Sequence, residues 1–180
     1  MNRRPIGDFC LFRIFGHEPD SRIPHAMKIH TLQSEIWVPH PREVVFDFFC
    51  HAENLEALTP HWLHFSILSP GPIEMKAGTR IRYRLRLHGL PLRWESAIRA
   101  WEPPHRFVDE QTSGPYRQWI HEHRFLEHEG GTRIRDNVQY SVAGGLLVHR
   151  LLVAPDLRRI FEFRRQKVAK IFRQTSCPAV

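Results

Sequence analysis

The chain has 180 residues, 42% of them hydrophobic and 25% charged, which is an ordinary globular composition with enough length for one domain and a sizeable core. No apolar run approaches the roughly 18 residues that a membrane-spanning helix needs. The net charge of +7 would suit an anionic lipid or nucleic-acid partner, but a basic surface in contact with water is the simpler explanation.

The cysteines indicate the cellular compartment, and the chain ends indicate the limits of the domain. The three cysteines are odd in number and far apart, at Cys10, Cys50 and Cys177. Such spacing predicts neither a disulfide framework nor a structural metal site, and it favours a reducing cytoplasm. The first 26 residues lack the apolar stretch and cleavage site of a signal peptide. We expect a disordered extension over 1–27, one domain over 28–173 and a flexible tail over 174–180.

The first part of the predicted domain mixes one strand with two short helices. Residues 29–38 alternate in polarity, which predicts a strand. Pro41 suits the first turn of a helix that carries an apolar stripe, and a second short helix fits residues 52–58. Strand character returns at 62–68.

Residues 79–88 form the clearest strand pattern. Apolar residues alternate with four arginines, Arg80, Arg82, Arg84 and Arg86. One face of this strand should therefore be buried, while the other presents a row of positive charge. A turn at Gly89-Leu90 predicts a hairpin in which Leu85 opposes Trp94, Tyr83 opposes Ser96 and Ile81 opposes Ile98.

Two later strands carry polar groups on a face that should point inward. After reversals at Pro103-Pro104 and 113–115, a two-residue turn at Glu129-Gly130 joins strands 117–125 and 132–140. The turn predicts four cross-strand pairs, namely Phe125 with Ile134, His123 with Asp136, His121 with Val138 and Trp119 with Tyr140. Because buried polar groups need partners, two histidines and an aspartate on this face indicate a lined cavity rather than simple core packing.

The chain closes with helical patterns. Gly144-Gly145 should end the sheet, and a short apolar turn or helix at 146–153 precedes Pro155. A long helix then continues to about residue 173 with an apolar stripe at three- and four-residue spacing. This stripe should lie on the sheet.

The order of elements resembles the START-like or SRPBCC superfamily, also called the helix-grip or Bet v 1-like fold, over about residues 28–173. The patterns that carry the resemblance are Phe46-Asp47-Phe48, Asn54-Leu55, Leu58-Thr59-Pro60, Phe107 to Gln111, Gly114-Pro115-Tyr116, Trp119-x-His121-x-His123-x-Phe125 and Asp136-x-Val138-x-Tyr140. They are similar to a bacterial ligand-binding subgroup related to polyketide cyclase/dehydrase-type proteins.

The resemblance implies an α+β protein in which a curved antiparallel sheet of about seven strands, two short helices and a long C-terminal helix enclose a cavity. It also implies entry near the two short helices, and relatives that hold lipids, quinones or polyketides. Some relatives cyclise or dehydrate polyketides, and others only carry or sense a ligand, so the fold leaves the activity open.

Strand parity and the resemblance together predict the residues of this ligand cavity. The expected apolar and aromatic walls are Phe46, Phe49, Leu55, Leu58, Tyr83, Leu85, Trp94, Ile98, Phe107, Trp119, Phe125, Val138, Tyr140, Phe161 and Val168. The further polar residues expected to face inward are Ser96, Asp109, Gln111, Arg117, His121, His123 and Asp136.

Three interpretations of the polar set remain open. Its members could neutralise one another beneath an apolar ligand, or Arg117 and Gln111 could orient the carboxylate or phenolate of an amphiphile. Alternatively, His123 and Asp136 could form an oriented general base, with Tyr140 or Tyr83 as proton donor in a polyketide cyclisation or dehydration. We favour a non-catalytic protein that binds or transports a small hydrophobic or amphipathic molecule such as a lipid, quinone or polyketide.

The sequence also allows metal, cofactor and macromolecular partners to be considered. His121, His123 and Asp136 are the ligand types of a zinc or non-haem iron site, but an HxH pair is common by chance among thirteen histidines, so we predict no metal and no cofactor. The arginine row could contact an anionic membrane as a lipid carrier would, although a solvated face is simpler. Nucleic acid is disfavoured because that face lacks stacking aromatics.

Overall fold

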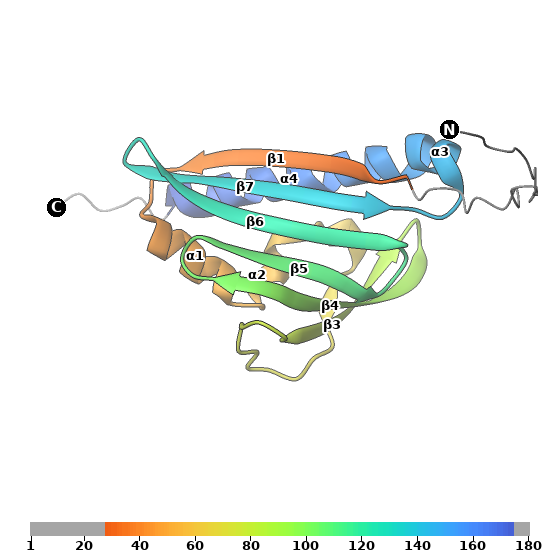
Figure 1. Ribbon diagram of the computed structural model, residues 1–180, viewed down its shortest axis with the longest axis horizontal. Coiled ribbons are helices and arrows are strands. Elements are labelled where there is room, and N and C mark those ends of the chain that lie inside the picture. The colour runs from red at the N-terminus through yellow and green to blue at the C-terminus, as the bar shows by residue number, and fades with distance from the viewer. Residues whose placement is uncertain (1–27, 175–180) are drawn as a thin grey trace, which may run out of the picture.

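The core of the architecture is one antiparallel sheet of seven strands in the order β1-β7-β6-β5-β4-β3-β2 (Figure 1). The computed structural model describes residues 28–174, so the expected extension at 1–27 and the last residues of the expected tail lie outside the described residues. The strands are β1 (His30–Val38), β2 (Ser66–Ile67), β3 (Arg80–Leu87), β4 (Leu90–Glu102), β5 (Arg106–Ser113), β6 (Gln118–His128) and β7 (Gly131–Ser141).

The helices lie against one face of this sheet. They are α1 (Arg42–Cys50), α2 (Asn54–Leu58), α3 (Gly145–Val148) and α4 (Ala154–Gln174), with a 3-10 turn η1 (His61–Leu63) and a π-helical segment η2 (His149–Val153). The long helix α4 runs along β1, while α1 contacts β6 and β7 and α2 contacts α4 (Figure 1). The predicted α+β helix-grip architecture is confirmed. No helix within 28–174 is long and apolar enough to cross a membrane.

The predicted register of the β6–β7 hairpin is confirmed at all four pairs. Its two turn residues, Glu129 and Gly130, both have positive φ, at 49° and 71°. Two positive φ values characterise the tight turn whose twist matches that of paired strands, and such a turn fixes which residues face each other. His123 is thereby placed opposite Asp136.

The predicted register of the β3–β4 hairpin was wrong by two residues. The turn residues are His88 and Gly89, with φ of 51° and 81°, rather than Gly89 and Leu90. The observed pairs are Leu85 with Leu92, Tyr83 with Trp94 and Ile81 with Ser96. A shift of two positions keeps every side chain on its predicted face, since side chains alternate with a period of two.

The strand predicted over 62–68 was also wrong in extent. Only Ser66 and Ile67 pair with β3, because the chain first makes the 3-10 turn η1. That turn ends at His64, whose φ of 43° lies in the left-handed region and redirects the backbone. The η1 segment contacts β3 instead of extending the strand.

Two apolar clusters fill the space between helices and sheet. One contains Phe107 of β5, Phe125 of β6, Ile134 of β7 and Val168 of α4, together with residues of α1. The other contains Trp94, Trp119, Val138, Tyr140, Leu157 and Phe161. Along β6, β7 and α4 the two clusters are separated by buried polar residues, which are His121 and His123, Asp136, and Arg164 respectively. These polar side chains therefore form one layer across the interior.

Candidate ligand-binding cavity

A cavity of about 240 Å³ lies between the inner face of the sheet and the helices. Its walls come from α1, α2, the η1 region, β3 to β6 and the first half of α4. The cavity extends from the short helices α1 and α2 to the β3–β4 hairpin and the start of α4, where Leu87 and Asp156 contribute to its lining.

Aromatic side chains form much of one wall. The ring of Trp94 stacks on Tyr83 at a centroid distance of 5.8 Å and meets Trp119 edge to face at 5.4 Å. The polar atoms of this wall are satisfied at Ser96, whose Oγ accepts a hydrogen bond from Trp94 Nε1 at 3.0 Å and lies 3.0 Å from the Tyr83 hydroxyl. This wall is therefore aromatic, and the polar atoms of Tyr83 and Trp94 are paired with Ser96.

His123 lies between two carboxylates. Its Nε2 is 3.2 Å from Asp109 Oδ2, and its Nδ1 is 2.8 Å from Asp136 Oδ1. Burial opposes a charge on the ring, but the bonds to both aspartates outweigh burial and raise the pKa of His123. The Phe107 ring stacks on the His123 ring at a centroid distance of 4.2 Å. Protonation of His123 therefore places a positive charge between the two carboxylates.

His121 has the opposite tendency. Burial and the neighbouring charge of His123 lower the pKa of His121, so its ring is neutral near pH 7. Its Nε2 is 3.1 Å from Asp136 Oδ1, which places the proton on Nε2. Its Nδ1 lies 3.7 Å from Asp109 Oδ2, beyond hydrogen-bond distance. A neutral ring with this tautomer has a lone pair on Nδ1.

Arg164 completes the cluster from the helix side. Its Nε lies 3.6 Å from Asp136 Oδ2, and its side chain is 10% exposed. Although burial opposes the charge on Asp136, the Arg164 guanidinium and the two histidines hold the pKa of that carboxyl well below its usual range. With His123 protonated, two positive groups balance the two carboxylates, so the cluster is electrically neutral without a ligand.

The structure places fourteen of the residues predicted for the site along the cavity, and eight elsewhere. Those that line it are Phe49, Leu55, Leu58, Tyr83, Leu85, Trp94, Ser96, Ile98, Phe107, Asp109, Trp119, His121, His123 and Phe161. Those outside the lining are Phe46, Gln111, Arg117, Phe125, Asp136, Val138, Tyr140 and Val168.

Four polar residues that were predicted to line the cavity lie outside its lining. Gln111 donates from Nε2 to the backbone oxygen of Tyr116 at 2.7 Å, which closes the β5–β6 connection. Arg117 precedes the first residue of β6. The Tyr140 hydroxyl is 2.9 Å from His149 Nε2. Asp136 is hydrogen-bonded to His121 Nε2 and lies within ion-pair distance of His123 Nδ1.

The displaced apolar residues belong to the packed interior. Phe46, Phe125 and Val168 lie in the first apolar cluster, and Val138 lies in the second. Strand parity identifies the inward face but does not separate a cavity wall from a close-packed core, because both kinds of residue point the same way.

Arg164 and Tyr116 were not predicted as site residues, although both line the cavity. For Arg164 a signal existed, since it interrupts the apolar stripe of the long helix at the spacing of buried residues. A buried arginine requires a carboxylate partner, and Asp136 was already predicted to face inward. Tyr116 offered no such signal because it lies in a turn.

Within residues 28–174, Asp109, His121 and His123 form the one group of side chains that could hold a metal ion. Their ligand atoms lie within 4.8 Å of one another. The set predicted from sequence contained Asp136 in place of Asp109. Asp136 lies outside the cavity lining and contacts His121 at Nε2 and His123 at Nδ1. The nearby Arg164 would oppose a cation, and a metal would have to replace the bonds that already join these side chains.

Comparisons with known proteins identify the family of this chain. A family model described as "Polyketide cyclase / dehydrase and lipid transport" matches residues 38–167. No curated protein matches the chain.

Solved structures share the fold at low sequence identity. TTHA0849 from Thermus thermophilus is 20% identical, with a TM-score of 0.62 over 82% of this chain and 100% of that one. The Zhui aromatase/cyclase from Streptomyces sp. R1128 is 13% identical, with a TM-score of 0.64 over 82% and 95%. Protein Ms6760 from Mycobacterium smegmatis is 18% identical, with a TM-score of 0.62 over 81% and 92%. The chain thus belongs to the family of polyketide cyclases, dehydrases and lipid transport proteins, within the SRPBCC or START-like superfamily.

Proposed function

We propose that the chain binds a small amphipathic molecule that carries a neutral hydroxyl group, with the apolar body in the aromatic cavity and the hydroxyl at His121. The observation that carries this proposal is a charge-balanced polar cluster at the wall of an otherwise apolar cavity. Ligand pockets commonly combine an apolar lining with a few placed polar groups that choose the ligand.

The cavity volume bounds the ligand. At about 240 Å³ it lies below the roughly 300–1,000 Å³ that is usual for pockets of drug-sized ligands. This size suits a molecule of one or two aromatic rings better than a whole phospholipid. The aromatic wall of Tyr83, Trp94 and Trp119 also favours a flat aromatic body.

The charges near His121 select the polar group. His121 Nδ1 can accept a hydrogen bond from a hydroxyl, whereas Asp109 beside it would repel a carboxylate or phenolate. Gln111 and Arg117, the residues predicted to bind an anionic head group, do not line the cavity. A neutral alcohol or phenol therefore fits better than an anion.

The test compares two probes of similar size, 2-naphthol and 2-naphthoate, by quenching of tryptophan fluorescence at neutral pH. We expect 2-naphthol to bind at least about tenfold more tightly, which is about 1.4 kcal/mol. Asp109→Asn should narrow that ratio by improving naphthoate binding. Equal or tighter binding of naphthoate by the unmodified chain would contradict the proposal. Native mass spectrometry of the freshly purified protein, with solvent extraction, would identify any ligand that co-purifies.

A second candidate function is a cyclase or dehydratase, which the family description supports. For this chain the base would be His121 rather than the His123–Asp136 pair, because the His123 nitrogens face carboxylates and its pKa is raised. Tyr83 lines the cavity, and burial and Asp109 raise its pKa well above the usual value, so the phenol keeps its proton and can donate a hydrogen bond to a substrate oxygen. Turnover of a polyketide-type substrate that is lost in His121→Gln would favour this function over carriage.

We also propose that a row of four arginines is the surface by which a carrier contacts an anionic membrane. These residues are Arg80, Arg82, Arg84 and Arg86. Two of these side chains already have partners, since Arg80 Nη1 donates to Glu95 at 2.7 Å and Arg84 Nε donates to Ser66 Oγ at 2.8 Å. Replacing all four with glutamine should reduce vesicle binding that is sensitive to salt. We also propose a cytoplasmic location, because the cysteine spacing favours a reducing compartment.

A further inference from the structure

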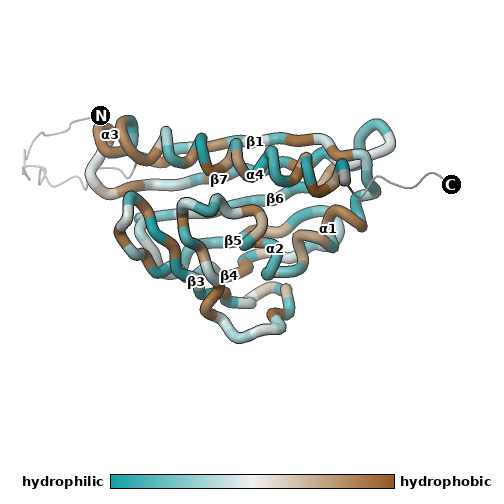
Figure 2. Tube along the Cα trace, turned by 180° about the vertical axis from the view of Figure 1, so that it is seen from behind, coloured by the Kyte–Doolittle hydropathy of each residue, from teal (hydrophilic) through white to brown (hydrophobic). Residues whose placement is uncertain are grey.

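Four leucines of α3 and η2 are exposed to solvent. Leu146 is 53% exposed, Leu147 70%, Leu151 65% and Leu152 52%. Figure 2 shows α3 as a brown, hydrophobic segment at the end of the molecule from which β1 begins. Single exposed leucines are common on protein surfaces, but four within seven residues form a patch that indicates an interaction site. We call these four leucines the leucine patch.

The segment that bears the leucine patch is anchored to the sheet by its other side. The His149 ring stacks on His30 of β1 at a centroid distance of 3.4 Å, and its Nε2 lies 2.9 Å from the Tyr140 hydroxyl of β7. Val153, the last residue of η2, packs against the apolar cluster that contains Leu157 and Phe161. The outward position of the leucines is therefore imposed by packing on the inward side of the same segment.

The leucine patch adjoins one end of the cavity. Val153, the last residue of η2, lines the cavity, as does Asp156 in the first turn of α4. His88 of the β3–β4 turn contacts Asp156 across this end, with Nε2 and Oδ2 2.7 Å apart. Leu90 of the same hairpin is 68% exposed. Apolar side chains thus flank both sides of the His88–Asp156 contact.

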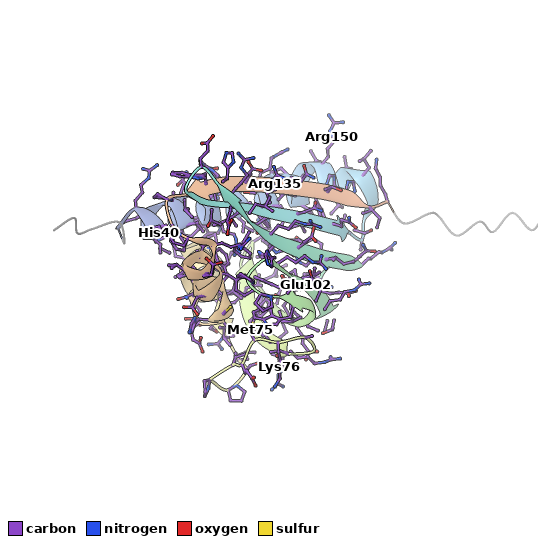
Figure 3. The ribbon with its side chains drawn as sticks, turned by 60° about the vertical axis from the view of Figure 1, so that its left-hand side comes forward. His40, Met75, Lys76, Glu102, Arg135 and Arg150 are labelled. Carbon is purple, nitrogen blue, oxygen red and sulfur yellow. The ribbon has the colours of Figure 1, made fainter. Side chains whose placement is uncertain are left out.

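The charge around the leucine patch is positive. Arg150 lies within it and extends away from the protein (Figure 3), and Arg158 is exposed on the next turns of the helix. Between residues 142 and 155 the sequence contains no acidic residue. Exposed leucines with arginine beside them are the combination by which peripheral proteins insert into the interface of a membrane with anionic lipids.

We propose that the leucine patch, with Arg150, docks onto an anionic phospholipid membrane and opens the adjoining end of the cavity to it. The patch inserts its leucines among the acyl chains while Arg150 contacts lipid phosphates. This inference goes beyond the proposed function, since docking to vesicles does not require the cavity ligand. It assigns to the carrier a route by which an amphipathic ligand passes between membrane and cavity at the His88–Asp156 end.

The test measures co-sedimentation of the full chain with phosphatidylcholine vesicles, with and without phosphatidylserine. We expect binding that requires phosphatidylserine and that falls at least about tenfold in Leu147→Gln/Leu151→Gln, because the two most exposed leucines of the patch are lost. The matched control is Leu68→Gln/Leu126→Gln, which replaces two exposed leucines elsewhere, at 45% and 37% exposure, and should bind as the unmodified chain does.

Three results would overturn the proposal. They are a failure of the unmodified chain to bind either kind of vesicle, equal binding by Leu147→Gln/Leu151→Gln, and a dimer in solution that dissociates in that variant, which would make the patch an interface between two copies. The second of these results, together with loss of vesicle binding when the four arginines of β3 are replaced, would locate docking on the face that carries those arginines. Titration with 2-naphthol reports separately on the cavity, and its affinity should be unchanged in the leucine variant.

Discussion

Arg164 of α4 reaches across the interior to Asp136 of β7, with its Nε 3.6 Å from Oδ2. This contact joins the long helix to the sheet within the polar layer, between the two apolar clusters. Both side chains are only 10% exposed, so neither charge can be stabilised by bulk water. The position of α4 against the sheet therefore depends on the charge of Asp136.

Replacement of Arg164 by methionine should destabilise the fold by about 3–5 kcal/mol at pH 7, because it leaves a buried carboxylate without its cation. Urea denaturation would measure the loss. Arg165→Met on the exposed side of the same helix is the matched control and should cost less than about 1 kcal/mol, as its pair with Glu162 is on the surface. A loss in Arg164→Met no larger than in the control would show that the contact contributes little.

The raised pKa of His123 predicts how stability depends on pH. A group whose pKa is higher in the folded state stabilises the protein fully below its unfolded pKa of about 6.5, and this contribution is lost as pH rises through the folded value. Denaturation curves from pH 6 upward should therefore show a decline in the unfolding free energy that is absent in His123→Gln. The control His105→Gln, at an exposed position, should keep the decline. The same alkaline decline in His123→Gln would assign it to another group.

Filling the cavity should weaken ligand binding without harming the fold. Leu85 lines the cavity and is only half-buried, so Leu85→Phe can extend into the cavity space. We expect about a tenfold loss of affinity for 2-naphthol, with stability changed by less than about 1.5 kcal/mol. Leu126→Phe adds the same volume on the outer face of β6 and should leave affinity unchanged. Unchanged affinity in Leu85→Phe would indicate that ligands bind elsewhere.

The β3–β4 turn should be sensitive to the residue at position 89. Gly89 has a φ of 81°, a region that costs a residue with a Cβ roughly 1–2 kcal/mol. No atom lies within 4 Å of the place where a Cβ would stand, so the cost of Gly89→Ala is backbone strain alone. Thermal unfolding should show the loss, and Gly89→Asn should recover part of it because asparagine tolerates positive φ. Equal stability of the alanine variant would mean that the turn relaxes to another form.

Local sequence determined the β6–β7 hairpin completely. The alternation from Trp119 to Phe125 and the turn at Glu129-Gly130 sufficed to place His123 opposite Asp136, since a two-residue turn admits one register. The β3–β4 hairpin was less determined, because Gly89 can occupy either position of a two-residue turn. Its error of two residues changed the cross-strand partners while it preserved the faces.

The chemistry of the polar layer was decided by tertiary structure. Sequence placed both histidines and Asp136 on one face, but the second carboxylate of His123 comes from Asp109, across the β5–β6 pairing, and the counter-charge of Asp136 comes from Arg164 on the helix. Which histidine is charged depends on those distances and on burial, neither of which a periodic pattern contains. A sequence fixes the direction of each side chain relative to its own strand, whereas the partners of a buried charge depend on how separate elements pack in three dimensions.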